Sequence, residues 1–317
     1  MKYFKGGCAA VAMMLSALIT SCSAPVSTGG SGASGRSIVS STPSFLIALP
    51  TSLTPLSTLT VEGSARTNTT PTLYGYQILH DGMVGSQAIV ALGGMMSVLW
   101  AEVISQNSLT PSPAAHSGMT LTVTSSFLKE YDAAVPSLLQ GSPKPSANQV
   151  INVPDFVFQT STDPRFSYEV TSNYAGASLQ FFWKAQAYAF RYINAGTTVK
   201  LATDDATASS VIDFSAGTVE YKMQFKTDSS SSEHGTSVLV TYTEPGVTLA
   251  VSGYGDDKGG AVTETGGSQI VTEGFTPEGK ITYQKIGTAV TMGTALGAAY
   301  SAKLSSSDVG SAASLIR

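Results

Sequence analysis

Cysteine is scarce in this sequence, which has only Cys8 and Cys22 among its 317 residues. Cys8 lies within the first 21 residues, which have the features of a removable export signal described below. Once this segment is removed, a single cysteine remains and the chain can form no intrachain disulfide, even in a compartment that permits them. The stability of the mature chain must therefore come from the packing of its side chains.

Charged side chains are also few. They make up 12% of the chain, with 17 basic and 21 acidic residues dispersed along it. Lys2 and Lys5 leave with the export signal, so the mature chain keeps 15 basic against 21 acidic residues, a net charge of −6. It contains neither the basic stripe that binds nucleic acid nor a polybasic patch for anionic lipid headgroups. Nucleic acid is therefore not expected as a partner.

Motifs that carry catalysis or hold cofactors are missing. The three histidines, His80, His116 and His234, are not at metal-ligand spacing, so we expect no metal site. The chain lacks a Gly-x-Ser-x-Gly elbow, a phosphate-binding loop and a dinucleotide fingerprint, so we expect no cofactor. These absences favour a protein that is not an enzyme. The alternative is a hydrolase displayed on the cell envelope without a recognisable motif, which could use His80 beside Asp81.

Two segments carry candidate binding chemistry. Residues 253–260 form an acidic, glycine-rich loop in which Asp256 and Asp257 could hold Ca²⁺, although such loops are more often hairpin tips. A stripe of aromatic side chains could line a ligand groove, although such stripes more often belong to the core. The stripe consists of Phe181, Trp183, Tyr188, Phe190 and Tyr192.

The N-terminus is typical of an exported protein. Lys2 and Lys5 form a short basic region, and residues 8–19 form an uncharged apolar run. The run is shorter than the roughly 20 apolar residues that span a bilayer. A basic region followed by a short apolar run and small residues indicates a secretory signal peptide over residues 1–21.

The end of this signal has a more specific pattern. Ile19 lies three residues before Cys22, and the small residue Ser21 lies just before it. This arrangement resembles the lipobox of bacterial lipoproteins. The resemblance implies diacylglyceryl transfer to the Cys22 thiol, cleavage between Ser21 and Cys22, and acylation of the new amino terminus with chains such as palmitate. Plain secretion after an Ala-x-Ala-like site is the alternative, but it leaves Cys22 unexplained.

The predicted lipid determines the location of the mature chain. Two or more acyl chains anchor a protein stably, whereas one chain binds only marginally. We therefore expect lipid attachment at Cys22 to hold the protein on a membrane of the cell envelope, and we expect this to be the outer membrane. Residues 22–70 are expected to form a tether, since residues 23–36 are nearly all Ser, Gly, Ala and Thr and Pro50 and Pro55 interrupt the following segment. Residues 71–317 are expected to form a single domain.

A long apolar helix is expected at the start of this domain. Residues 82–101 carry no charge, and apolar side chains recur at helical spacing over residues 82–105. A helix that is apolar on all sides is buried in a core or spans a membrane. The many glycines and serines, together with the lipid anchor, favour the core. A second, short helix is expected over residues 127–132.

From residue 150 onward the sequence alternates with a period of two. The clearest example is residues 219–225, where Val219, Tyr221, Met223 and Phe225 are separated by polar residues. Turn signals such as Asn194-Ala195-Gly196 separate these runs. We therefore predict an α+β fold: a curved antiparallel sheet, a meander or half-barrel, packed on one long N-terminal apolar helix. This outline resembles lipoprotein-carrier folds at the level of architecture only. The expected function is non-enzymatic, with an apolar ligand or another envelope component as the partner.

Overall fold

The computed structural model describes residues 71–134, 145–174, 176–184, 187–204, 209–228, 235–256, 258–266, 270–277, 281–298 and 300–301. The export signal, Cys22 and the tether (residues 1–70) lie outside the described residues, so the predictions made for them stay predictions.

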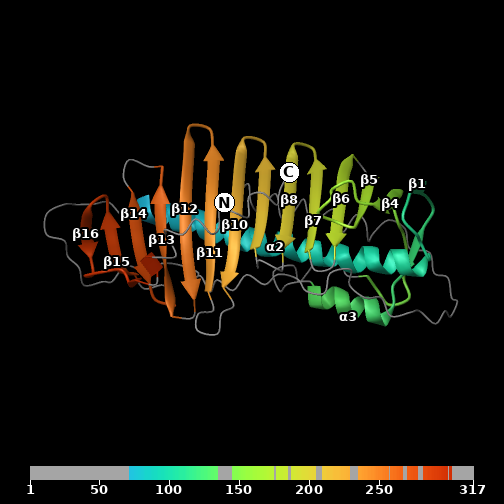
Figure 1. The fold of residues 1–317 in the computed structure, drawn as a ribbon, viewed down its shortest axis with the longest axis horizontal. Coiled ribbons are helices and arrows are strands. Elements are labelled where there is room, and N and C mark those ends of the chain that lie inside the picture. The colour runs from blue at the N-terminus through green and yellow to red at the C-terminus, as the bar shows by residue number, and fades with distance from the viewer. Residues whose placement is uncertain are drawn as a thin grey trace. The chain divides into compact units, whose positions relative to one another are not determined.

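An antiparallel sheet of 14 strands dominates the described chain (Figure 1). Its order is β1 followed by β4 to β16, so from β4 onward each strand lies beside its successor in the sequence. The strands are β1 (Ser112–His116), β4 (Phe156–Thr160), β5 (Tyr168–Tyr174), β6 (Ala177–Lys184), β7 (Ala187–Asn194), β8 (Thr197–Asp204), β9 (Ser209–Ala216), β10 (Val219–Asp228), β11 (Gly235–Glu244), β12 (Val247–Asp256), β13 (Gly259–Thr265), β14 (Val271–Phe275), β15 (Ile281–Ile286) and β16 (Ala289–Met292). The predicted antiparallel sheet is thus confirmed.

The predicted fold class is wrong. The described chain is mainly β rather than α+β, because the 14-stranded sheet and the small pair β2 (Thr120–Thr122) and β3 (Val150–Asn152) far outweigh two helices. The described chain is mainly β because its strands follow one another through tight turns. Each such turn returns the chain antiparallel to the preceding strand and so adds a strand to the same sheet. At Asn194-Ala195-Gly196, for example, both Ala195 (φ 44°) and Gly196 (φ 82°) have the positive φ of a type I′ hairpin turn.

Helix α2 (Pro71–Gln106) contains the stretch 82–105. Proline is well suited to its first position, where the backbone N–H would have no helical partner. The helix ends in a Schellman motif: Ser108 has a positive φ of 50°, and the Leu109 N–H donates to the Ile104 carbonyl at 3.0 Å. Within the described part of the chain, no helix combines the length and apolar character needed to cross a membrane.

Helix α3 (Ser125–Ala134) contains the predicted helical stretch 127–132. Thr124 caps it, because its Oγ1 accepts a hydrogen bond from the Phe127 N–H at 3.0 Å. The rings of Phe127 and Tyr131 stack at 5.7 Å on its buried side. Burial, and to a smaller extent the neighbouring charge of Asp132, raises the pKa of Tyr131 to about 12.

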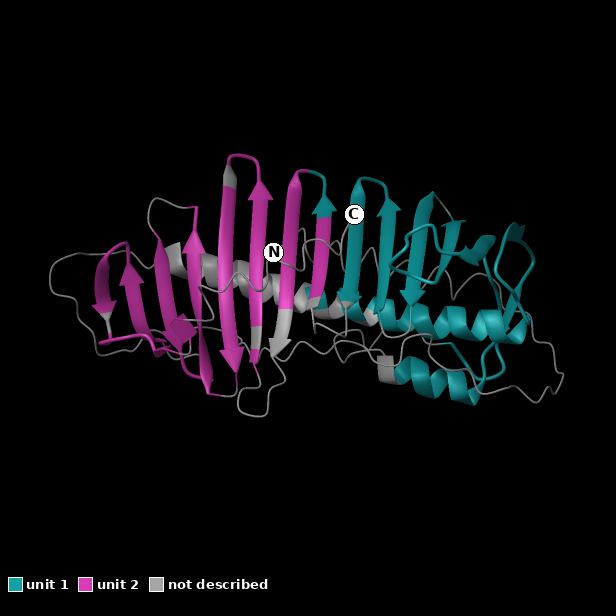
Figure 2. Cartoon of the chain, in the orientation of Figure 1, with its two compact units in different colours: residues 1–43, 85–206, 215–217 teal, residues 44–84, 207–214, 218–317 magenta. Residues whose placement is uncertain are grey.

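The described residues divide into two compact units (Figure 2), which we describe separately. Unit 1 contains residues 85–206 and 215–217. Its strands place large apolar side chains in register across one face of the sheet, and all of them are buried. One such row runs through Phe158, Val170, Phe181, Phe190 and Leu201.

Unit 2 contains residues 71–84, 207–214 and 218–301 of the described chain. The predicted strand 219–225 lies in β10, and its four alternating apolar side chains are buried as expected. One buried row here carries mainly valines. It runs through Met223, Val240, Val251, Glu264 and Val271, and ends at the half-buried Ile286.

Candidate functional site

The site predicted most specifically, Cys22, lies outside the described residues, as do His234 and Asp257. His80 lies in helix α2. His116 lies in β1 directly opposite Phe156 of β4, and the two rings are 5.2 Å apart. Among the described residues, no group of three or more His, Cys, Asp or Glu is placed to hold a metal ion. The structure therefore places His116 beside an aromatic ring and joins it to no candidate ligand.

The acidic loop lies at a hairpin end, where Asp256 of β12 pairs with Gly259 of β13. One carboxylate oxygen of Asp256, Oδ1, accepts a hydrogen bond from the Lys258 N–H at 2.8 Å. The same oxygen accepts a second hydrogen bond from the Tyr300 hydroxyl at 3.1 Å. These contacts fit the hairpin-tip interpretation, because the oxygen already has two donors from the chain itself.

The aromatic stripe is part of the core of unit 1. Its five members are at most 7% exposed, and Phe181, Tyr188 and Tyr192 are fully buried. The ring of Trp183 stacks on Phe158 at 5.8 Å, and Phe181 contacts both Trp183 and Tyr188. Of the two interpretations of the stripe, core and ligand groove, the burial of all five side chains supports the core.

Helix α2 packs against this stripe. The Tyr188 hydroxyl donates to the Val90 carbonyl at 3.4 Å, and its ring lies over Gly93. A Cβ added at Gly93 would come within 2.4 Å of Tyr188 Cε2, so only glycine allows the helix this close to β7. Farther along the helix, the Trp100 ring lies 5.1 Å from that of Phe156. The helix therefore occupies the aromatic side of this part of the sheet.

Buried carboxylates are the polar feature that the sequence did not reveal. Four glutamates are between 1% and 5% exposed, and a buried charge is costly unless hydrogen bonds compensate it. They are Glu102, Glu169, Glu264 and Glu273. A glutamate that alternates with apolar residues in a strand normally lies on the solvent-exposed face of the sheet. The sequence pattern therefore predicts exposure for the glutamates of the strands, and not burial.

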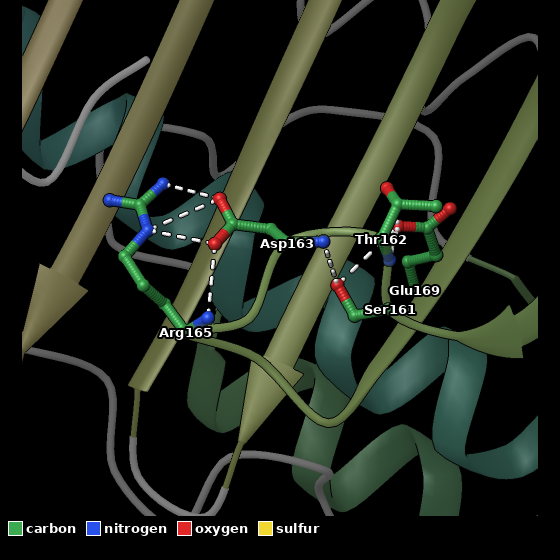
Figure 3. A network of polar contacts seen from close by, with 5 residues as sticks. All are labelled: Ser161, Thr162, Asp163, Arg165 and Glu169. Carbon is green, nitrogen blue, oxygen red and sulfur yellow. Dashed lines mark hydrogen bonds and ion pairs between the residues drawn. The ribbon is translucent and has the colours of Figure 1, made fainter.

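Glu169 of β5 has the most complete set of donors (Figure 3). One oxygen, Oε1, accepts from Gln159 Nε2 at 2.6 Å. The other, Oε2, accepts from the backbone N–H and the hydroxyl of Thr162 at 2.9 and 2.8 Å, and from Ser161 Oγ at 3.4 Å. The carboxylate thus fixes the loop between β4 and β5, and its burial is explained by these donors.

The same loop carries an ion pair. Arg165 Nη2 lies 2.6 Å from Asp163 Oδ2, and Arg165 Nε donates to both oxygens of this carboxylate. The Arg165 guanidinium also lies 5.4 Å from the centre of the Phe166 ring. Asp163 accepts a further hydrogen bond from the Arg165 N–H, so the pair stabilises the turn that it belongs to.

Two of the other buried carboxylates, Glu102 and Glu273, also accept hydrogen bonds from glutamine side chains. Glu102 Oε1 accepts from Gln106 Nε2 at 2.8 Å, and the amide of Gln106 also pairs with both backbone groups of Thr122. Glu273 Oε1 accepts from Gln284 Nε2 at 2.7 Å. These contacts join neighbouring segments of the fold.

Comparison with known proteins adds no relative: no family model, no curated protein and no solved structure matches this chain.

Proposed function

We propose that the protein is a lipid-anchored, non-enzymatic component of the bacterial cell envelope that binds another envelope component. The anchor is lipid on Cys22, and the outer membrane is the membrane that we favour. The observation that carries the choice of partner is the packing of helix α2 on the aromatic stripe. Because Tyr188 is fully buried against Val90 and Gly93, this face does not offer an apolar ligand an open surface.

The opposite face of the same strands supports a hydrophilic partner. A row in register across β5 to β8 consists of polar side chains: Thr171, Gln180, Arg191 and Lys200. Arg191 is exposed and the other three are half-buried. A polar, partly charged sheet face is suited to a hydrated macromolecular partner and unsuited to an acyl chain.

The anchor is tested with the two cysteines as a matched pair. Cys22→Ala should move the protein from the detergent phase to the aqueous phase in a phase-separation assay, because it removes the acylated thiol. Cys8→Ala, which changes the other cysteine within the export signal, should leave partitioning unchanged. Detergent-phase partitioning of Cys22→Ala equal to that of the parent would refute lipid anchoring at this residue.

The nature of the partner is tested with a fluorescent fatty-acid analogue. The purified protein in detergent-free buffer, with Cys22 replaced, should give no saturable increase in fluorescence. Stoichiometric binding of the analogue that Gly93→Ala or Phe181→Leu weakens would favour an apolar ligand instead.

A further inference from the structure

The face of unit 2 that carries Tyr254 contains a row of small residues between two tyrosines. Tyr254, Ala261, Gly274 and Tyr283 are directly paired across β12 to β15, so their side-chain positions share one face. The floor of this row, Ala261 and Gly274, has no side-chain atom beyond Cβ. With strands about 4.8 Å apart, the flanking tyrosines leave room for an inserted side chain. We name these four residues, together with Asp256 of the same face, the strap site.

A segment of the chain's own C-terminal part occupies the strap site. We name the described residues 294–298 and 300–301 the strap. A Cβ added at Gly274 would come within 2.9 Å of Leu296 Cδ1, so the Leu296 side chain lies over this glycine. The Tyr300 ring lies 5.8 Å from that of Tyr254. The row beneath is almost inaccessible: Tyr254 is 2%, Ala261 0% and Tyr283 8% exposed.

Side chains hold the strap to the sheet. Two of its side chains act as anchors: Leu296 contacts the floor, and the Tyr300 hydroxyl donates to Asp256 Oδ1 at 3.1 Å. The backbone hydrogen bond described for the strap, from the Ser301 N–H to the Gly297 carbonyl, lies within the strap itself. Thr294 and Ala295 are exposed. Anchors four residues apart on a helical turn are a common form of peptide recognition.

The connection to β16 is suited to a hinge. Gly293 has a positive φ of 73°, and a Cβ there would come within 2.5 Å of the Thr282 carbonyl oxygen. Any other residue would be strained at this point, so the chain turns sharply there from the sheet edge onto the face. Ordering the strap beyond this turn costs conformational entropy, which its contacts with the sheet offset.

We propose that the strap site is a peptide-binding site that the strap occupies in cis. Its ligand is a peptide segment that presents an aliphatic side chain four residues before a tyrosine, and binding of such a segment from a partner protein displaces the strap. The proposal adds a binding site in unit 2 to the polar face of unit 1, and rests on the proposed function only for placing the partner in the envelope.

The test uses the full chain and a fluorescein-labelled peptide with the sequence of residues 293–301. Leu296→Asp should release the strap from an intact site, and fluorescence anisotropy should then detect peptide binding at least tenfold tighter than to the parent. Adding Gly274→Val to this variant should abolish the gain, because the new side chain fills the position of Leu296. Far-UV circular dichroism verifies that each variant is folded.

A second arm does not depend on the folding of the Gly274 variant. A peptide in which the leucine is replaced by aspartate should bind Leu296→Asp at least tenfold more weakly than the parent peptide. Equal binding of the two peptides, or equal binding of the parent peptide to the parent chain and to Leu296→Asp, would overturn the proposal. Neither result bears on the lipid anchor, which is measured by detergent partitioning.

Discussion

Two buried rows, one in each unit, stabilise the same kind of sheet with different side chains. A buried row in unit 1 is built from rings and aliphatic residues, such as Phe158, Phe181 and Phe190, and helix α2 packs against this face. A buried row in unit 2 carries Val240, Val251 and, among them, the carboxylate of Glu264. The side chains of the unit 1 row each bury a larger apolar surface, so removing one of them should cost more stability than removing a valine from the unit 2 row.

The largest expected effect on the free energy of unfolding comes from truncating a ring in the unit 1 row, compared with truncating a valine in the unit 2 row. Phe181→Ala should lower the free energy of unfolding by about 3–5 kcal/mol, as for buried aromatic residues generally. Val251→Ala in unit 2 should cost about 1.5 kcal/mol, because it removes only two buried carbons. Denaturant unfolding should be followed by tryptophan fluorescence and by far-UV circular dichroism. Both tryptophans, Trp100 and Trp183, lie in unit 1, so fluorescence reports that unit alone. Equal costs for the two variants would contradict the comparison.

A smaller effect on the free energy of unfolding is expected at the buried carboxylate of Glu169 in unit 1. Glu169→Gln keeps the shape of the side chain but removes the charge that four donors share, so we expect a loss of about 1.5–3 kcal/mol. The control is Glu220→Gln in unit 2, where Glu220 forms an exposed pair with Lys222 at 3.0 Å. Such pairs contribute about 0–1 kcal/mol. A neutral Glu169→Gln in the same denaturant assay would show that the carboxylate does not hold the loop.

The smallest effect is a pH dependence from Tyr131. Its pKa is raised from 10.0 to about 12 in the folded chain, first by burial and then by the charge of Asp132. Between these values the unfolded chain releases the proton while the folded chain retains it, so stability falls as the pH rises from about 10 to 12. Tyr131→Phe should reduce this fall by on the order of 1 kcal/mol.

The measurement is the denaturant midpoint at pH 9 to 12 in the parent and in the variant. Asp132→Asn is the companion variant, since it removes the smaller of the two causes and should retain most of the pH dependence. An alkaline loss of stability that is identical in Tyr131→Phe and the parent would exclude Tyr131 as its source.

The sequence was informative where a local rule determines the structure. The turn at Ala195-Gly196 and the alternation over 219–225 depend on neighbouring residues, and both appear as predicted. The prediction of the fold class was wrong because the fold class depends on how many strands join one sheet, and no single segment determines that number. The packing of Gly93 on Tyr188 joins positions 95 residues apart, so periodicity could not reveal it.

The candidate sites differ in the same way: some features depend on neighbouring residues, and others depend on contacts between distant parts of the chain. The aromatic stripe could be recognised from its spacing, but only the position of α2 decides that it is core. Glu169 looked like a wet-face residue because its donors, Ser161 and Thr162, belong to a loop whose path the alternation does not specify. The lipid on Cys22 stays a prediction from the lipobox resemblance.

The central claim, that lipid on Cys22 anchors this protein, is tested most directly by mass spectrometry of its mature N-terminus. Trypsin should release a peptide of residues 22–36, because Arg36 is the first basic residue after Cys22. In membrane-purified protein this peptide should have the mass of its sequence plus a diacylglyceryl group, with or without a further acyl chain on the amino terminus. An unmodified peptide that begins at Cys22, or a mature N-terminus at any other residue, would contradict the account.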